Sequence, residues 1–299
     1  MAFSYVIVNP TAGAGNTIKK WPKIKLYLEK IGLDFDYSLT ESHGHAIKLS
    51  KLAARKGYKM LVSVGGDGTI SEVAQGLYEE ERLKSVMMGV ISTGTGADYI
   101  RTIGIPSNYF DACRLLLKPK TRSVDVGIIE FANNYKRLFV NFAGLGFATD
   151  VVKATSQAYK TTGPMTSYLL GLLSTLISYC NKEVSIKIDG HIQKRKIVTV
   201  LIGNGKYAGG GMKTTPDADT QDGLFDVLIV DDMTKLDLLL SLPMIYKGTH
   251  LSHPKVVVKK VKEIEIFADQ KACVQVDGDI VGETPVRLYV HPTAMNLVV

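Results

Sequence analysis

Apolar and polar positions follow two alternating periods over the first 125 residues of the chain. Strand-like segments lie at 3–8, 35–39, 60–64 and 86–91, and segments with helical spacing of apolar residues lie at 24–31, 45–57, 70–77 and 108–118. This alternation predicts an α/β N-terminal domain with a doubly wound, mostly parallel sheet. Ligands of such sheets bind beyond the carboxyl ends of the strands, so the loops at those ends are the first candidates for a site.

From about Thr121 the pattern changes to short β-rich segments that are separated by turn residues. One helical segment, at about 151–180, interrupts them. We therefore predict a β-rich C-terminal domain, built as an antiparallel sandwich or barrel. The expected domains are residues 1–124 and 125–286.

The charge and the cysteine content narrow the range of partners. A formal net charge of +7 favours an anionic partner, which could be nucleic acid, an acidic membrane face or a phosphate compound. The chain has no arginine-rich arm, RNA-binding signature or zinc-ligand spacing, so we predict that it does not bind nucleic acid. Three widely spaced cysteines do not make a disulfide framework. This cysteine pattern favours a reducing, cytoplasmic location. The most apolar stretch, 165–180, is shorter than the roughly 18 residues that a membrane-spanning helix needs.

The segment LVSVGGDGTI (residues 61–70) places a glycine-rich turn directly behind an apolar run. Its glycines, which allow a ligand to approach the backbone amides, are Gly65, Gly66 and Gly68. Thr69 and Glu72 have the spacing of a capping box for the helix that follows, and such a helix start is an anion site. Asp67 would repel a phosphate directly, so we expect Mg²⁺, or water bound to it, between the two. A tight turn with a surface aspartate is the alternative.

Two further glycine loops follow predicted strands of the same domain. They are NPTAGAGN (residues 9–16) and STGTGADYIR (residues 92–101). Neither is a Walker A loop, and no GxGxxG motif follows a strand, so a standard dinucleotide site is not indicated. Three such loops at one predicted sheet edge favour a phosphate-bearing ligand.

The chain resembles the diacylglycerol kinase catalytic-domain family, in particular its soluble bacterial lipid kinases, which share a superfamily with NAD kinases and phosphofructokinases. The resemblance covers nearly the whole chain and rests on NPTAGAGN, GGDGTISEVAQGL, GTGADYIR, VDVG (124–127), GNGKYAGGGMKTTPDADTQDGLFDV (203–227) and DGDIVGETP (277–285). The GGDGT segment alone would also fit an NAD kinase.

The resemblance implies that ATP lies over the glycine loops of the N-terminal domain, and that 287–299 returns to this domain. It implies that Asp67, Asp98 and Asp125 organise catalytic Mg²⁺ through water, although Asp125 also fits a simple strand-edge residue. The implied nucleotide-binding residues are Asn9, Pro10, Gly13, Gly65, Gly66, Asp67, Gly68, Thr69, Glu72, Thr93, Gly94 and Thr95.

In the C-terminal domain the resemblance makes Asp277 the general base that takes the proton of the substrate hydroxyl. Without the resemblance, the Asp-Gly pair at this position would be read as a hairpin turn. Asp279 stands where the family usually has glutamate. The resemblance also implies a structural Mg²⁺ site made by Asp219, Asp222 and the carbonyl group of Leu224.

A second departure from the family pattern is Ala97, which replaces the asparagine of the usual GTxND segment and removes an amide that would contact nucleotide or brace the loop. The helical segment offers an apolar face that could contact acyl chains or could be an ordinary core face. Its residues are Tyr168, Leu169, Leu172, Leu173, Leu176 and Ile177.

Together these features predict an ATP- and Mg²⁺-dependent kinase that phosphorylates a lipid hydroxyl at a membrane surface, with diacylglycerol as the leading substrate. An NAD kinase and a catalytically silent nucleotide- or lipid-binding protein are the alternatives. We expect a cytoplasmic protein that associates peripherally with the membrane. The sequence leaves a homodimer open.

Overall fold

The computed structural model describes the backbone of residues 2–158 and 164–299, and the side chains of 2–155 and 170–299. Two compact units make up the chain. Unit 1 comprises Met1–Val126 and Pro292–Val299, and unit 2 comprises Gly127–His291. Strands β5 (Thr121–Phe131) and β15 (Val286–Val298) each run from one unit into the other along the chain.

Unit 1 contains a parallel sheet with the order β2-β1-β3-β4 and the end of β15 beside β4. Its strands are β1 (Ser4–Val8), β2 (Phe35–Leu39), β3 (Met60–Gly65) and β4 (Met87–Ser92). β1 and β3 are buried throughout, because apolar side chains on both faces of these strands are covered. The predicted doubly wound α/β domain is confirmed.

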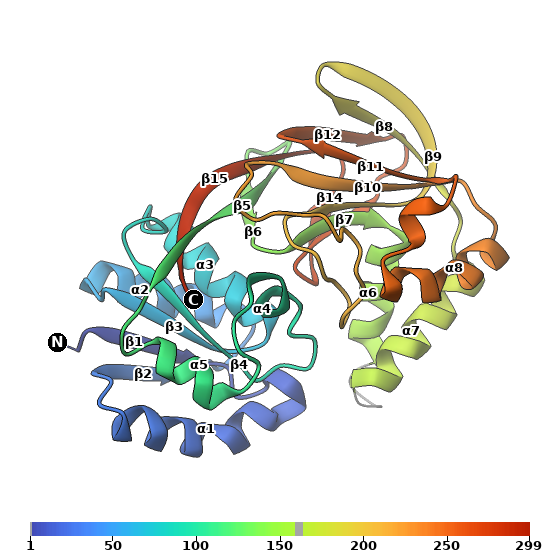
Figure 1. Ribbon diagram of the computed structural model, residues 1–299. Helices are drawn as coiled ribbons and strands as arrows, with labels where there is room; N and C mark the ends of the chain where they lie inside the picture. Colours follow the sequence, from blue (N-terminus) through green and yellow to red (C-terminus); the bar gives the residue numbers. More distant parts are fainter. Residues whose placement is uncertain (1, 159–163) are drawn as a thin grey trace. The chain divides into compact units, whose positions relative to one another are not determined.

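Helices cover both faces of this sheet, with α1 and α5 on one face and α2 and α3 on the other (Figure 1). The helices of unit 1 are α1 (Ala12–Lys30), α2 (His45–Lys56), α3 (Asp67–Glu79), α4 (Asp98–Ile103) and α5 (Tyr109–Leu115). Helices α3 and α4 begin immediately after the loops that follow β3 and β4. The sheet therefore positions the glycine loops.

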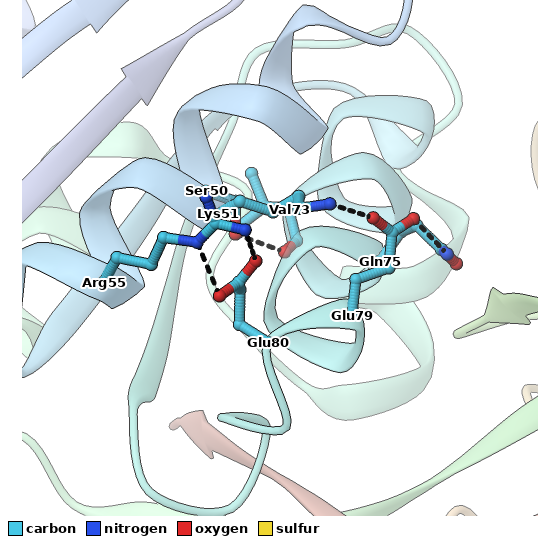
Figure 2. Close-up of polar contacts among 7 residues, drawn as sticks. All are labelled: Ser50, Lys51, Arg55, Val73, Gln75, Glu79 and Glu80. Carbon is cyan, nitrogen blue, oxygen red and sulfur yellow. Dashed lines mark hydrogen bonds and ion pairs between the residues drawn. The ribbon is translucent and has the colours of Figure 1, made fainter.

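Helices α2 and α3 approach each other closely at Gly76. A Cβ atom there would lie 2.5 Å from Cβ of Ser50 and 2.6 Å from the carbonyl oxygen of Ile47. The Ser50 hydroxyl donates to the carbonyl of Val73 across this contact, at 2.8 Å (Figure 2). Ion pairs at the rim join Lys51 to Glu79 and Arg55 to Glu80. The glycine thus lets a polar interface form without separating the helices.

Unit 2 is β-rich, as predicted. Its other strands are β6 (Lys136–Phe139), β7 (Phe142–Gly146), β8 (Lys182–Ile188), β9 (His191–Gly203), β10 (Phe225–Asp231), β11 (Val256–Val261), β12 (Glu263–Ala268), β13 (Cys273–Val276) and β14 (Asp279–Glu283). The paired strands here are antiparallel, and β9 pairs with β7, β8 and β10. One face of these strands encloses a large apolar core that includes Phe139, Phe225 and Leu288.

The helices of unit 2 pack over a second apolar cluster. They are α6 (Phe147–Ala158), α7 (Pro164–Ser178), α8 (Lys235–Lys247) and the short 3-10 helix η1 (His250–Ser252). The predicted helical segment at 151–180 corresponds to α6 and α7, whereas the sequence did not predict α8. In the described part of the chain, no helix combines the length and the apolar character that a membrane crossing requires.

Candidate active-site residues

The loop after β1 has an unusual backbone. Gly13, Ala14 and Gly15 all have left-handed conformations, with φ of 62°, 56° and 77°. The regular part of α1 therefore begins after Gly15. The Gly15 N–H donates to the carbonyl oxygen of Thr11 at 3.0 Å, and glycine at two of the three positions lowers the cost of this sharp turn. Gly13 also lies so close to the carbonyl oxygen of Thr93 that a Cβ atom would clash with it.

Hydrogen bonds join this loop to the loops that follow β3 and β4. Asn9 Nδ2 donates to Thr69 Oγ1 at 3.0 Å, and the hydroxyl groups of Thr17 and Thr93 are 2.5 Å apart. The carbonyl oxygen of Gly65 accepts from the Thr93 N–H at 2.8 Å. Unit 1 therefore brings the three glycine loops together at the carboxyl edge of its sheet, although their roles in nucleotide binding stay predictions.

Asp67 connects the second loop to the start of α4. Its Oδ2 accepts the Asp98 N–H at 3.2 Å and its Oδ1 accepts the Tyr99 N–H at 3.1 Å. Burial raises the pKa of Asp67, while these two N–H groups and the charge of Arg101 act in the opposite direction. A cation beside this carboxylate would favour its ionised form.

The carboxyl group of Asp98 lies near that of Asp67. A Cβ atom on Gly96 would be 3.2 Å from Asp67 Oδ2 and 3.6 Å from Asp98 Oδ2, so both oxygens face this glycine. Asp98 is buried and pairs with Arg101, whose Nη1 donates to Oδ1 at 3.1 Å. Asp125 is fully buried in β5, where its Oδ1 accepts the N–H of Thr293 at 2.6 Å. Asp125 thereby binds the returning C-terminal segment.

The predicted capping box is wrong. The N-cap residue of α3 is Gly66, without a side-chain capping bond, and Thr69 lies inside the helix. Glu72 instead caps α2: its Oε1 accepts the Gly44 N–H at 2.9 Å and its Oε2 accepts the Ala46 N–H at 3.1 Å. The glycine turn itself starts α3, which moves Thr69 into the first helical turn. A nucleotide-binding role for Glu72 stays a prediction.

Ala97 has the left-handed conformation, with φ of 54° and ψ of 32°, at the N-cap position of α4. Asparagine adopts this conformation more readily than alanine does. The departure from the family pattern therefore places a residue with an unfavourable backbone preference next to Asp98.

In unit 2, Asp277 and Gly278 form a two-residue turn between β13 and β14, with φ of 47° and 92°. The hairpin turn that the Asp-Gly pair indicates is thus present. The Asp277 carboxylate also accepts three backbone N–H groups from the β6–β7 connection and the first residue of β7. Its partners are Val140 at 2.8 Å, Asn141 at 3.0 Å and Phe142 at 2.9 Å. These charge-assisted bonds fix the orientation of the carboxylate.

Asn141, whose N–H binds the Asp277 carboxylate, is a candidate site residue that the sequence analysis did not identify. Its carbonyl oxygen accepts the N–H groups of Asn204 and Gly205 at 2.9 and 3.1 Å, and its Nδ2 donates to the carbonyl of Tyr207 at 3.0 Å. Its side chain is 5% exposed, and Oδ1 has no hydrogen-bond partner within the described residues. The signal was a single asparagine within the apolar run FVNFAG (139–144).

Asp279 forms an ion pair with Arg137, whose side chain is buried, at 3.9 Å. A buried guanidinium without a carboxylate nearby would be costly. The aspartate found here in place of the family's glutamate therefore still provides charge compensation next to the Asp277 turn.

The predicted structural Mg²⁺ ligands lie in the loop before β10. Asp219 Oδ1 accepts the Gln221 N–H at 3.0 Å, and Asp222 Oδ1 accepts the Leu224 N–H at 3.0 Å. Lys260 Nζ donates to Asp222 Oδ2 at 2.7 Å. Among the described residues no three His, Cys, Asp or Glu side chains are grouped to hold a metal ion. A site made by two carboxylates and one carbonyl group stays a prediction.

The predicted acyl-contact face of α7 divides into two parts. Leu172 and Leu176 are buried in the second apolar cluster of unit 2. Leu173 and Ile177 are exposed. The side chains of Tyr168 and Leu169 lie outside the described residues.

Two family models match the chain. The diacylglycerol kinase catalytic domain matches residues 4–129, and the YegS C-terminal NAD kinase beta sandwich-like domain matches residues 143–299. A diacylglycerol kinase of Staphylococcus carnosus is 31% identical over 281 residues, which cover 94% of this chain and 89% of the relative. A diacylglycerol kinase of Staphylococcus aureus strain MRSA252 is 30% identical, with 94% and 87% covered.

Solved structures from Bacillus anthracis share the fold. One has a TM-score of 0.79 at 26% identity and covers 99% of this chain and 96% of its own. A second, the crystal structure of a diacylglycerol kinase, has a TM-score of 0.73 at 24% identity with the same coverage. The similarity therefore extends through both units.

Proposed function

The chain belongs to the diacylglycerol kinase family and is a lipid kinase, and we propose that it transfers the γ-phosphoryl group of ATP to the hydroxyl group of diacylglycerol, giving phosphatidate. The observation that carries this proposal is the joining of three glycine loops at the carboxyl edge of the unit 1 sheet. Their N–H groups and the start of α3 supply positive potential where a triphosphate would lie. The chain has no P-loop lysine, so these groups carry more of the charge stabilisation.

Asp67 and Asp98 fit a magnesium ion, with Asp125 as a further member of the set. Their donor atoms are carboxylate oxygens, the ligands that Mg²⁺ prefers, and the ion would be held largely through water. Burial raises the pKa of Asp67, and a cation nearby would offset this effect. Once bound, Mg²⁺ would neutralise charge on the transferring phosphoryl group. We further propose that Asp219, Asp222 and the Leu224 carbonyl hold a structural Mg²⁺.

Asp277 is the proposed general base, which accepts the proton of the lipid hydroxyl as the phosphoryl group is transferred. The N–H groups of Val140, Asn141 and Phe142 hold its carboxylate in one orientation. The ion pair between Arg137 and Asp279, the residue that follows Gly278, stabilises the same turn. Asn141 Oδ1 is a buried acceptor next to these N–H groups, suited to a hydroxyl group or a water molecule.

The proposal is tested with γ-labelled ATP and a panel of acceptors in mixed micelles: diacylglycerol, monoacylglycerol, phosphatidylglycerol and a sphingoid base. We expect label to enter phosphatidate, and the transfer to stop when a chelator removes Mg²⁺. Replacing ATP with labelled GTP identifies the donor. If the folded protein transfers label to none of these lipids, the proposed activity is refuted.

The same assay with NAD added as an acceptor distinguishes two other functions. Label transferred to NAD would indicate an NAD kinase. Nucleotide binding without transfer to any acceptor would indicate a silent homologue, for which Ala97 and Asp279 are the supporting departures. We propose that the protein works in the cytoplasm, peripherally bound to the membrane that holds its substrate. A homodimer stays a prediction.

A further inference from the structure

Helix α8 of unit 2 exposes apolar side chains along its outer face. None of its residues is buried, although Leu238 and Leu242 pack against the second apolar cluster. Leucines on the opposite side are open to solvent, with Leu236 at 64% and Leu240 at 67% exposure. Leu239 and Tyr246 of this helix are also exposed. An amphipathic surface helix normally presents polar residues at these positions.

Helix α7 has a similar division. Leu172 and Leu176 point into the second apolar cluster, while Leu170, Leu173 and Ile177 are exposed, the last of them by 77%. The segment Pro164–Ser178 contains no charged residue. The outer face of α7 therefore has no charged group to hold it in water.

The two outer faces belong to one surface. Lys235 Nζ, at the start of α8, donates to the carbonyl oxygen of Ile177 near the end of α7. Asn181 Nδ2 donates to the Met233 carbonyl at 3.1 Å just beyond these residues. Figure 1 shows α7 and α8 at the same end of unit 2. We name this the α7–α8 surface; it comprises Leu170, Leu173, Ile177, Leu236, Leu239, Leu240 and Tyr246.

The charges at the edge of the α7–α8 surface are mainly positive. Lys235 and Lys247 stand exposed at the two ends of α8, and Lys255 is exposed farther along the chain. The acidic residue of α8, Asp237, is engaged at the helix start, where its Oδ2 accepts the Thr234 hydroxyl at 2.8 Å. Asp232 is held by Lys196 at 3.3 Å. The edge therefore complements an anionic surface.

A second copy of the chain suits this surface poorly. Antiparallel pairing of two α8 helices would bring Lys235 of one copy toward Lys247 of the other, and parallel pairing would oppose identical lysines. Like charges at both ends disfavour either arrangement. An anionic bilayer offers apolar depth for the leucines, headgroups for the lysines and an interfacial level for Tyr246.

We propose that the α7–α8 surface docks unit 2 on a bilayer that contains anionic lipid, with the leucines inserted at the level where the headgroups meet the acyl chains. This inference rests on the proposed function, since a kinase of diacylglycerol has to reach a substrate that is embedded in a bilayer. Most of the binding comes from apolar burial, and the lysines add attraction that salt weakens.

Cosedimentation of the full chain with vesicles tests the inference. The vesicles contain phosphatidylcholine alone or mixed with phosphatidylglycerol. The double variant Leu236→Glu/Leu240→Glu should bind the anionic vesicles roughly tenfold more weakly than the wild type, because two inserted leucines become charged. The matched control is Leu26→Glu on α1, which is also 67% exposed and should bind like the wild type. Unchanged melting temperatures show that the variants fold.

Three outcomes overturn the proposal. The double variant binds vesicles as the wild type does, or wild-type binding does not depend on phosphatidylglycerol. In the third outcome, the wild type is a dimer that the double substitution converts to monomers without any change in vesicle binding.

A pair of activity measurements separates this inference from the proposed function. The double variant should lose turnover on long-chain diacylglycerol in vesicles but retain wild-type turnover on a short-chain diacylglycerol dissolved as monomers. Loss on both substrates would contradict a docking role. If the wild type phosphorylates neither substrate, the proposed function fails, and vesicle binding alone decides whether the surface docks on lipid.

Discussion

Asp67 serves the fold of unit 1 as well as the proposed chemistry, because its carboxylate accepts the first two N–H groups of α4. Asp67→Ala should therefore abolish lipid phosphorylation and also lower the free energy of unfolding by about 1 kcal/mol, the usual cost of losing a cap. Turnover with labelled ATP and chemical denaturation measure the two effects.

Asp34→Ala is the matched control for this prediction. The Asp34 carboxylate also accepts a backbone N–H, that of Phe3 at 3.0 Å, but outside the glycine loops. This variant should lose comparable stability and keep wild-type turnover. Full turnover in Asp67→Ala would refute the proposed metal network.

Ala97 allows the strain at the start of α4 to be measured. Ala97→Asn should raise the free energy of unfolding by about 1 kcal/mol, because asparagine tolerates the left-handed conformation better than alanine. The added amide should also tighten ATP binding, which calorimetry can measure. A less stable variant would show that the methyl group of Ala97 makes contacts that outweigh the strain.

Among the secondary-structure elements, the interface of α2 and α3 depends on one glycine. Gly76→Ala should lower the free energy of unfolding by about 1–3 kcal/mol, because the added methyl group would overlap Ser50 and a backbone carbonyl. Gly68→Ala in the same helix has open space at its Cβ position and should be neutral or slightly stabilising. Denaturant titration compares the two, and equal effects would contradict the close packing.

The sequence predicted β1 and β3 well because each is a short, wholly buried apolar run, whereas β2 is partly exposed and carries Asp36 and Ser38. It did not predict α8, whose leucines lie on both faces and so give no one-sided helical period. It also misassigned Glu72, because capping-box spacing cannot show that the glycine turn starts α3 or that Glu72 reaches α2. If the outer face of α8 contacts lipid as proposed, apolar residues on both of its faces are expected, and the one-sided helical pattern is then absent from the sequence.

At the scale of the whole molecule, the end of the chain completes unit 1. Met295 and Leu297 are fully buried, Leu297 pairs with Met88 of β4, and the Thr293 N–H binds Asp125. Deleting 292–299 should expose the edge of β4 and leave unit 1 without cooperative folding, as limited proteolysis and thermal melting can measure. A truncated chain with the wild-type melting temperature would contradict this role.

Other parts of the candidate site could not be derived from the residue pattern. The Asp277 carboxylate binds an N–H that is 137 positions away, and no local periodicity records such a contact. Asp98, Asp125 and Asp277 were recognised through family resemblance, and Asn141 was missed because its significance lies in its burial. The expected division of the chain into domains of residues 1–124 and 125–286 stays a prediction.

The measurement that tests the central claim most directly is the turnover of Asp277→Asn with labelled ATP, Mg²⁺ and diacylglycerol. Removing a positioned general base should lower turnover by about 100-fold or more while ATP affinity stays at the wild-type value. Hydrogen exchange at residues 140–142 shows whether the N–H groups held by Asp277 remain protected in the variant. Turnover close to that of the wild type would contradict the account.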